Sequence, residues 1–112
     1  MTAPVLNRPM VLEDRVQLPD GAGGFSEGWQ ALGTVWVGVR PGAGRGGDVA
    51  GLAVGQVTHR LTCRAAPVGA PSRPRAGQRL REGARVFRIL AVAEADGHQR
   101  YLVCTAREEV AA

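Results

Sequence analysis

The sequence predicts an all-β fold, a small antiparallel β-barrel or sandwich of five to six strands with one long Gly-rich loop inserted between central strands. The 112 residues are enough for one domain with a modest core, but not for two domains. The 16 glycines and 7 prolines make up about a fifth of the chain and favour short strands joined by turns over long helices. Apolar and polar residues also alternate in several segments, with the period of a half-buried strand.

The first predicted strand covers residues 10–18 and follows an extended N-terminal arm, residues 1–9. Asp14 interrupts its apolar face near the middle. Pro19-Asp20-Gly21 predicts a turn, and residues 22–28 are expected to form a flexible connection. The apolar face of the strand consists of Met10, Leu12, Val16 and Leu18.

The second predicted strand covers residues 29–40 and contains Gly33 and Gly38. Glycines inside a strand often mark a bulge or a close approach of another backbone. Apolar side chains occur on both faces of this segment, which predicts a central or bent strand. One face carries Val35, Val37 and Val39, and the other carries Leu32 and Trp36.

A Gly-rich segment, residues 41–55, separates this strand from the next one. Loops of that length inside a compact domain are uncommon and are usually functional or disordered. The segment is too poor in large side chains to build a core of its own. We therefore expect the rest of the chain to be a scaffold that holds this loop.

Residues 56–66 show the clearest period of two in the chain. One face holds Val57, His59, Leu61, Cys63 and Ala65, and the other holds Gln56, Thr58, Arg60, Thr62 and Arg64. Residues 67–77 are predicted to be a loop, and residues 78–82 a short strand.

The last two predicted strands, residues 84–94 and 100–107, flank Asp96-Gly97. Asp-Gly between apolar runs is a strong hairpin signal, because a type I′ turn requires positive φ at both central positions. Residues 108–112 are predicted to be a short acidic C-terminal tail.

The Gly-rich segment also matches a nucleotide-binding pattern, because residues 42–47 read G-x-G-x-x-G after a strand. A dinucleotide site needs a helix that opens at the last glycine and an acidic residue about 20 residues further on. The region near Pro67 has no acidic residue, two further glycines follow Asp48, and the chain is too short for that fold. A Walker loop is excluded because the sequence has no lysine. No cofactor is expected.

Metal and catalytic sites are also not expected. On a strand, His59 and Cys63 lie roughly 13 Å apart and cannot chelate one ion together. No Cys-x-x-Cys pair exists, and His98 belongs to the predicted turn. No serine lies in a G-x-S-x-G motif, and no nearby acid completes a triad. The sequence therefore predicts a protein that is not an enzyme, with Cys63 and Cys104 reduced and buried.

The charge is uneven along the chain. The net charge is +4, and all 14 basic residues are arginine, which binds carboxylates and phosphates bidentately. Residues 1–56 hold four arginines against five acids, and residues 57–112 hold ten against five. Such asymmetry is typical of nucleic-acid contact or of complementary charged faces between subunits, although a GC-rich genome would also replace lysine by arginine.

Six of these arginines fall within residues 73–88 and are opposed there only by Glu82. They could follow a phosphate backbone. Proteins that bind single strands without sequence preference, however, add aromatic residues for base stacking, and here only Phe87 is available. A solvated or intersubunit face is therefore the favoured interpretation.

The order of these segments resembles that of phage head–tail joining proteins, over roughly Leu12 to Glu109. Two segments depart from the family. The Gly-rich segment has more glycine than is usual there, and the loop of residues 67–76 has more proline and arginine. The matching segments are Glu13-Asp14-Arg15-Val16, Thr34 to Pro41, Val57 to Arg64, Arg85 to Val92, Asp96-Gly97, Tyr101 to Cys104, and Glu108.

The resemblance implies a β-barrel that assembles as a ring below the portal and joins a DNA-filled head to a tail. Such a head-closure or stopper protein would gate the DNA channel with its long loop, in a tailed phage, a prophage or a gene transfer agent. The implied partners are copies of itself (a hexamer favoured, a dodecamer possible), a portal or adaptor protein, a tail terminator or tail tube protein, and packaged double-stranded DNA.

The resemblance also implies the location and the contact residues. The chain lacks a signal-like start and an apolar span, so we expect it in the cytoplasm during assembly and then in the neck of the virion, without membrane contact. The alternative is a small β-barrel that binds single-stranded nucleic acid. The candidate channel-loop residues are Gly42, Gly44, Arg45, Gly46, Gly47 and Asp48. The candidate subunit or DNA contacts are Arg40, Arg60, Arg64, Arg73 and Arg75.

Overall fold

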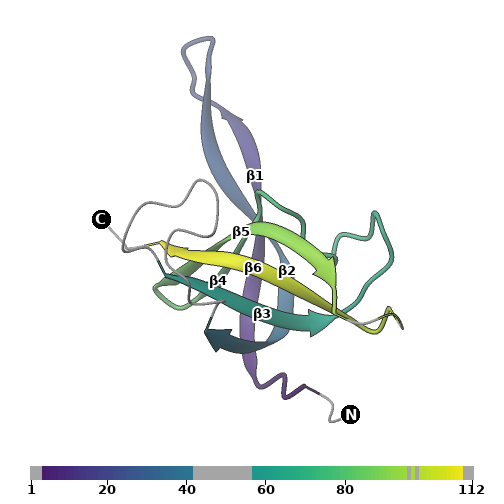
Figure 1. Ribbon diagram of the computed structural model, residues 1–112. Coiled ribbons are helices and arrows are strands. Elements are labelled where there is room, and N and C mark those ends of the chain that lie inside the picture. Colours follow the sequence, from purple (N-terminus) through teal and green to yellow (C-terminus); the bar gives the residue numbers. More distant parts are fainter. Residues whose placement is uncertain (1–3, 42–56, 96, 98, 110–112) are drawn as a thin grey trace.

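A computed structural model describes residues 4–41, 57–95, 97 and 99–109 and contains six β-strands (Figure 1). The described residues contain no helix. Each strand pairs antiparallel with its neighbours, in the order β1-β2-β3-β6-β5-β4, and the sheet closes on itself as a barrel. The predicted all-β fold and the number of strands are confirmed. The strands are β1 (Arg8–Pro19), β2 (Phe25–Pro41), β3 (Thr58–Arg64), β4 (Arg79–Glu82), β5 (Arg85–Glu94) and β6 (Tyr101–Glu109).

Closure of the barrel depends on the shortest strand. β4 has four residues, and it pairs with β5 on one side and with Val11 to Glu13 of β1 on the other. Because both edges of β4 are bonded, the first and last segments of the sheet meet there. Within the barrel itself no sheet edge is free, which removes a route to aggregation there.

Eleven apolar side chains fill the barrel, each at most 1% exposed. They confirm the alternation predicted for the third strand, because Leu61 and Cys63 point inward while Arg60 and Arg64 are exposed. Both cysteines are free and buried, as predicted. The core residues are Met10, Leu12, Val37, Leu61, Cys63, Leu80, Phe87, Ile89, Leu102, Cys104 and Ala106.

The outer halves of β1 and β2 leave the barrel as a projecting hairpin, residues 14–30 (Figure 1). In this hairpin β1 and β2 pair only with each other, because the pairing of β1 with β4 ends at Glu13 and that of β2 with β3 begins at Val37. Two expectations are therefore wrong. Val16 and Leu18 do not belong to the core, and the supposed flexible connection of residues 22–28 is partly strand, since β2 begins at Phe25.

Asp14 stands where the apolar face of β1 leaves the barrel. Met10 and Leu12 are 1% exposed on one side of it, whereas Leu18 is 50% exposed on the other. The interruption that the sequence shows at Asp14 is thus the boundary between core and projecting hairpin. The period of two continues through it because the hairpin is still a pair of strands.

Gly33 and Gly38 perform the two roles expected of glycine inside a strand. The register between β1 and β2 shifts beside Gly33, whose φ of 141° favours glycine. At Gly38, a Cβ atom would lie 2.4 Å from the carbonyl oxygen of Val5. Gly38 therefore lets the N-terminal segment lie directly on β2. β2 is a central strand, paired with β1 and β3, as predicted.

The remaining elements lie close to their predicted bounds, with differences at the chain ends. Arg8 and Pro9 of the predicted N-terminal arm belong to β1, and Glu108 and Glu109 of the predicted tail belong to β6. The predicted pairing of the last two strands is confirmed, since β5 and β6 are antiparallel partners. The predicted two-residue turn at Asp96-Gly97 is wrong, because Ala95 donates a hydrogen bond to the carbonyl oxygen of Tyr101 and Gly97 lacks the positive φ of a type I′ turn. Asp96 and His98 lie outside the described residues.

Candidate functional site

The predicted channel loop lies outside the described residues, but both of its attachment points are described. β2 ends at Pro41, and Pro41 is the register partner of His59 at the start of β3. Residues 42–56 therefore connect two strands that are direct neighbours in the barrel. The six candidate loop residues, Gly42, Gly44, Arg45, Gly46, Gly47 and Asp48, all fall in this segment.

Three of the predicted contact residues lie together on the outer surface of β2 and β3. Arg40 and Arg60 are register partners, and Arg64 follows on the same face of β3. All three are exposed, and none forms an ion pair with another described residue. We call these three arginines the basic face. Their charges are available to a partner.

Arg107 extends the basic face from β6 and was not among the predicted contact residues. It pairs with Thr58, which lies on the polar side of β3, so the two side chains share the outer surface. The inward positions of β6, Leu102, Cys104 and Ala106, already imply that Arg107 points outward. The alternation of β6 could therefore have identified it.

The other two predicted contact residues are placed elsewhere. Arg73 donates a hydrogen bond of 2.8 Å from Nη1 to the carbonyl oxygen of Ala66, in the loop that follows β3. The guanidinium of Arg75 lies 3.5 Å from a carboxylate oxygen of Asp14, at the base of the projecting hairpin. The structure brings Arg40, Arg60 and Arg64 together, but not Arg75.

Five of the six arginines in residues 73–88 have a carboxylate partner within the chain, Arg75 among them. Arg79 and Arg81 both pair with Glu13, at 2.6 and 3.1 Å between Nε and the carboxylate oxygens. Arg85 pairs with Glu108 at 2.7 Å, and Arg88 with Glu109 at 3.1 Å. The run is therefore not the open phosphate-binding stripe that its sequence allows. Nor is it simply a solvated face, because these side chains are held by carboxylates of the same chain.

Glu13 is the buried centre of this charge cluster. Its side chain is 8% exposed. Burial alone would raise the pKa of the carboxyl group, but the hydrogen bonds from Arg79 and Arg81 outweigh burial and hold the pKa below its usual value. Glu13 is consequently ionised at neutral pH, and it ties β1 to β4.

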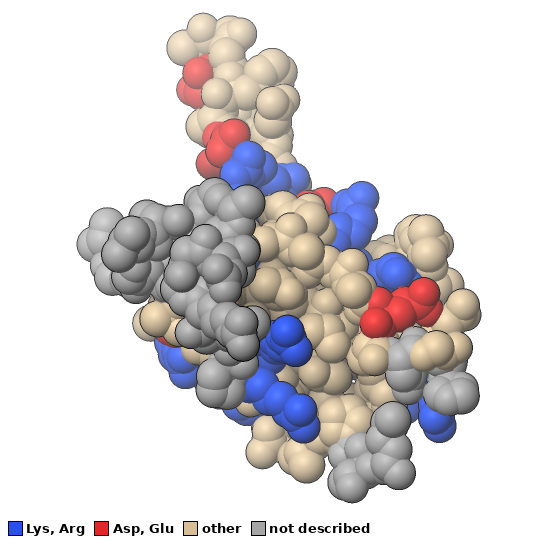
Figure 2. All heavy atoms as spheres, in the orientation of Figure 1, with Lys and Arg blue, Asp and Glu red and all other residues tan. Residues whose placement is uncertain are grey.

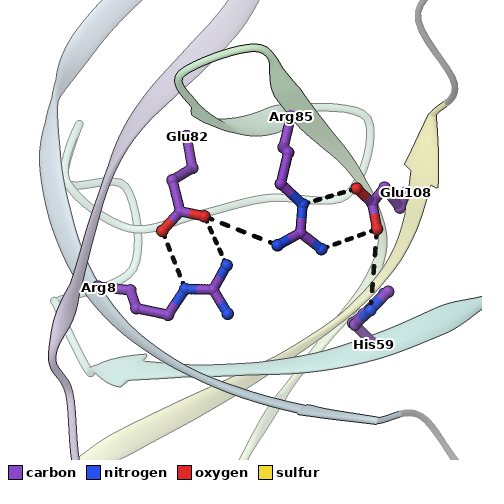
Figure 3. A network of polar contacts seen from close by, with 5 residues as sticks. All are labelled: Arg8, His59, Glu82, Arg85 and Glu108. Atoms are coloured by element: carbon purple, nitrogen blue, oxygen red, sulfur yellow. Dashed lines mark hydrogen bonds and ion pairs between the residues drawn. The ribbon is translucent and has the colours of Figure 1, made fainter.

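A second network joins five of the six strands at one end of the barrel (Figure 3). Arg8 of β1 donates from Nε to Glu82 of β4 at 2.9 Å, and Arg85 of β5 donates from Nε to Glu108 of β6 at 2.7 Å. His59 of β3 lies 3.9 Å from Glu108. The hydrogen bonds from Arg8 and Arg85 lower the pKa of Glu82 and of Glu108, respectively. The network closes the barrel end from which the channel-loop segment starts.

The thiols and the histidine offer no metal centre in the part of the chain that the structure describes. Cys63 and Cys104 lie in the core, where the hydrogen bond that the Cys104 thiol donates to Cys63 and burial both raise the pKa of Cys104. Among the described residues, no three His, Cys, Asp or Glu side chains are grouped as ligands for an ion. His59 packs edge-on against Phe87, with ring centroids 5.3 Å apart.

Membrane contact by a helix is likewise not indicated. Across the described residues there is no helix with the length and apolarity needed to cross a bilayer.

The space-filling view shows both signs of charge on the barrel, with acidic atoms beside basic ones at its right-hand side (Figure 2). Acidic atoms occur along the projecting hairpin, and basic atoms occur at its base and on the barrel face that β3 and β6 form. Among the described residues, the features available to other molecules are thus a basic face and a projecting hairpin. A small barrel with these features belongs to the class of assembly and binding domains, whose function depends on surfaces.

Comparison with known proteins gives the family. The sequence pattern of phage head completion proteins matches residues 1–109, and the chain belongs to this family. The resemblance to head–tail joining proteins is therefore confirmed. As a member, the chain has a structural role in completing a phage-like head.

Two solved structures are similar to the chain. One is a chain in the virion of a native gene transfer agent particle, with 53% identity, a TM-score of 0.78, and coverage of 98% of this chain and 100% of that one. The other is protein SF1141 from Shigella flexneri 2a, with 22% identity, a TM-score of 0.69 and coverage of 98% of both chains; it supports the fold alone. No curated protein shows significant similarity to the chain.

Proposed function

We propose that the chain forms a ring at the head–tail junction of a phage or gene transfer agent particle and acts there as a head-closure, or stopper, protein. The observation that carries this proposal is the 53% identity, over nearly the whole length, to a chain of a gene transfer agent virion. In the ring it binds a portal or adaptor protein on the head side, and a tail terminator or tail tube protein on the tail side. Copies assemble in the cytoplasm and become part of the virion neck.

The loop of residues 42–56 is the proposed gate of the DNA channel. Its ends, at Pro41 and Val57, leave from neighbouring strands, so every copy presents it from the same barrel end. Glycine lets identical loops from several subunits approach one another closely near a symmetry axis. Arg45 would contribute positive charge toward packaged DNA, and Asp48 would limit that charge. Six copies are favoured and twelve are possible.

Deletion of residues 45–54 tests the gate. The barrel should stay folded and heads should remain attached to tails, because every core residue lies outside the deletion. Packaged DNA should leak from purified particles, as measured by nuclease-sensitive DNA per particle. A matched variant carries Gly-Ser repeats of equal length in place of residues 45–54, and it separates the effect of loop length from that of the side chains. If particles with the deletion retain DNA as well as the parent particles, the gating role is wrong.

A further inference from the structure

We propose that the projecting hairpin of one copy docks in an apolar groove on the barrel of the next copy, and that this head-to-tail contact builds the ring. The inference rests on the proposed ring, and it names the two surfaces that would form it. The hairpin supplies Leu18 from one face of its tip and Phe25 from the other, since Leu18 is the register partner of Ser26 and neighbouring strand positions point to opposite faces. The groove is lined by the N-terminal segment, β2 and the ends of β3 and β6, among them Leu6, Trp36 and Tyr101.

The hairpin is incompletely stabilised by its own chain. A two-stranded hairpin is marginally stable in water unless a third strand or another packed element covers it. Leu18 and Phe25 near its tip are 50% and 67% exposed. Leu18 lies over Gly28 of the paired strand, which has no side chain to cover it, so both apolar side chains keep much of their surface in contact with solvent.

The base of the hairpin, in contrast, is firmly held. The ring of Trp29 lies against three guanidinium groups, with centroid distances of 4.1 Å to Arg79, 5.1 Å to Arg88 and 5.7 Å to Arg15. Glu13, directly at the base, pairs with Arg79 and Arg81. The hairpin is therefore aimed in a fixed direction away from the barrel, with its apolar side chains at the far end.

The groove offers a matching surface. It is an open groove of about 680 Å³, in which apolar side chains such as Trp36, 55% exposed, lie beside Thr34 and Ser72. Arg64 stands at its margin, as part of the basic face. Near its tip the hairpin carries Asp20, whose charge is opposite to that of the groove margin, whereas Glu27 already faces Arg15 of the same hairpin at 3.9 Å. Apolar contact would provide affinity, and the charges would select this pairing over hairpin to hairpin.

The contact must form between chains, because the hairpin cannot reach its own groove. Phe25 and Trp36 lie eleven positions apart in the same extended strand, which separates them by roughly 35 Å. In Figure 1 the hairpin also leaves the barrel on the side opposite the N-terminal segment, which lines the groove. Two different surfaces of one chain that bind each other form a heterologous contact, which closes into a ring when the rotation permits.

Pairing of hairpin edges between copies is the less favoured contact. Pro19 ends β1, glycines occupy three of positions 21–24, and Arg15 and Glu27 place charges along the strands. These features oppose the addition of a strand at an exposed edge. We therefore assign recognition to the side chains of the tip rather than to the backbone of the hairpin.

Cysteine crosslinking of the double variant Ser26→Cys/Thr34→Cys tests the contact. Ser26 adjoins Phe25 on the hairpin and Thr34 lines the groove, and both are exposed. The native Cys63 and Cys104 are at most 1% exposed and should not react. A short bismaleimide is applied to the full chain at the highest concentration that stays in solution, and to particles assembled with the variant. We expect a ladder of products at successive multiples of the chain mass.

Two further variants decide whether the tip carries the contact. Phe25→Ser added to the crosslinking pair should abolish the ladder. Val68→Ser is the matched control, because Val68 is 86% exposed but does not line the groove; this variant should keep the ladder. Dimers alone in both preparations, no products in either, or a ladder that survives Phe25→Ser would each overturn the proposal.

The outcomes separate this contact from the gating role. A ladder together with retained DNA in the loop-deletion particles would leave the contact intact and reject the gate. DNA leakage from those particles without a ladder would support the gate and reject the contact.

Discussion

At the scale of single residues, the main determinants of this surface are pairs of opposite charge that are distant in sequence. Glu13 meets Arg79 and Arg81, which follow it by 66 and 68 positions. The run of six arginines looks like unopposed positive charge in the sequence, but in the folded chain much of that charge is paired with carboxylates. The partners of these arginines could not be predicted from the charge pattern, because only closure of the barrel brings β4 beside β1.

Glu13→Gln should destabilise the barrel by about 2 kcal/mol, since it leaves two guanidinium groups without their carboxylate in a mostly buried place. The pKa of Glu13 is lower in the folded chain than in the unfolded chain, where it is about 4.3. Its contribution is therefore complete above that unfolded pKa and is lost as the pH falls through the folded pKa. Urea unfolding at several pH values measures both effects.

The control for this prediction is Glu94→Gln, at the exposed end of β5. It should change the free energy of unfolding little at neutral pH. Glu13→Gln should in addition flatten the fall in stability at acidic pH. A parent chain and a Glu13→Gln variant with the same stability and the same acid profile would show that the cluster contributes nothing.

At the scale of elements, the alternation of apolar and polar residues within each strand predicted the structure better than the order of the strands along the chain did. The inward residues of β3 and the pairing of β5 with β6 could be predicted, because a period of two and an Asp-Gly dipeptide are local signals. The projecting hairpin could not, because β1 and β2 alternate in the same way inside and outside the barrel. The barrel ends where β1 stops pairing with β4 and β2 stops pairing with β3. The sequence of β1 carries no signal for either point.

Trp29→Ala should loosen the projecting hairpin without opening the barrel. Each cation–π contact between the ring and an arginine contributes roughly 0.5–1 kcal/mol at an exposed site, and Trp29 has three such contacts. Hydrogen exchange of the amides in residues 15–19 and 25–30 should become faster, while that of core amides such as Leu61 and Leu102 should stay unchanged.

Trp36→Ala is the matched control for the hairpin, because Trp36 lies in the same strand, is 55% exposed and contacts no described guanidinium group in this way. It should leave exchange in the hairpin as in the parent. Equal acceleration in both tryptophan variants would mean that the arginine contacts do not hold the hairpin.

At the scale of the whole molecule, which has a net charge of +4, the arginines form two groups. Some already have carboxylate partners, and others have none among the described residues. The paired arginines lie on β1, β4 and β5 and in the loop before β4, and the basic face lies on β2 and β3. A nucleic acid that meets the isolated chain should therefore bind at the basic face.

Binding of single-stranded DNA by the full chain should be weak and carried by the basic face. Arg60→Gln/Arg64→Gln should reduce the slope of log affinity against log salt by about 1.4, since each phosphate contact contributes about 0.7 for a single strand. Arg79→Gln/Arg81→Gln, which removes the same charge, should leave the slope nearly unchanged, because Glu13 already occupies those two side chains. Fluorescence anisotropy across a salt series measures each slope. A slope that depends instead on Arg79 and Arg81 would mean that nucleic acid displaces Glu13, and tight binding by the parent at physiological salt would favour the single-strand-binding alternative.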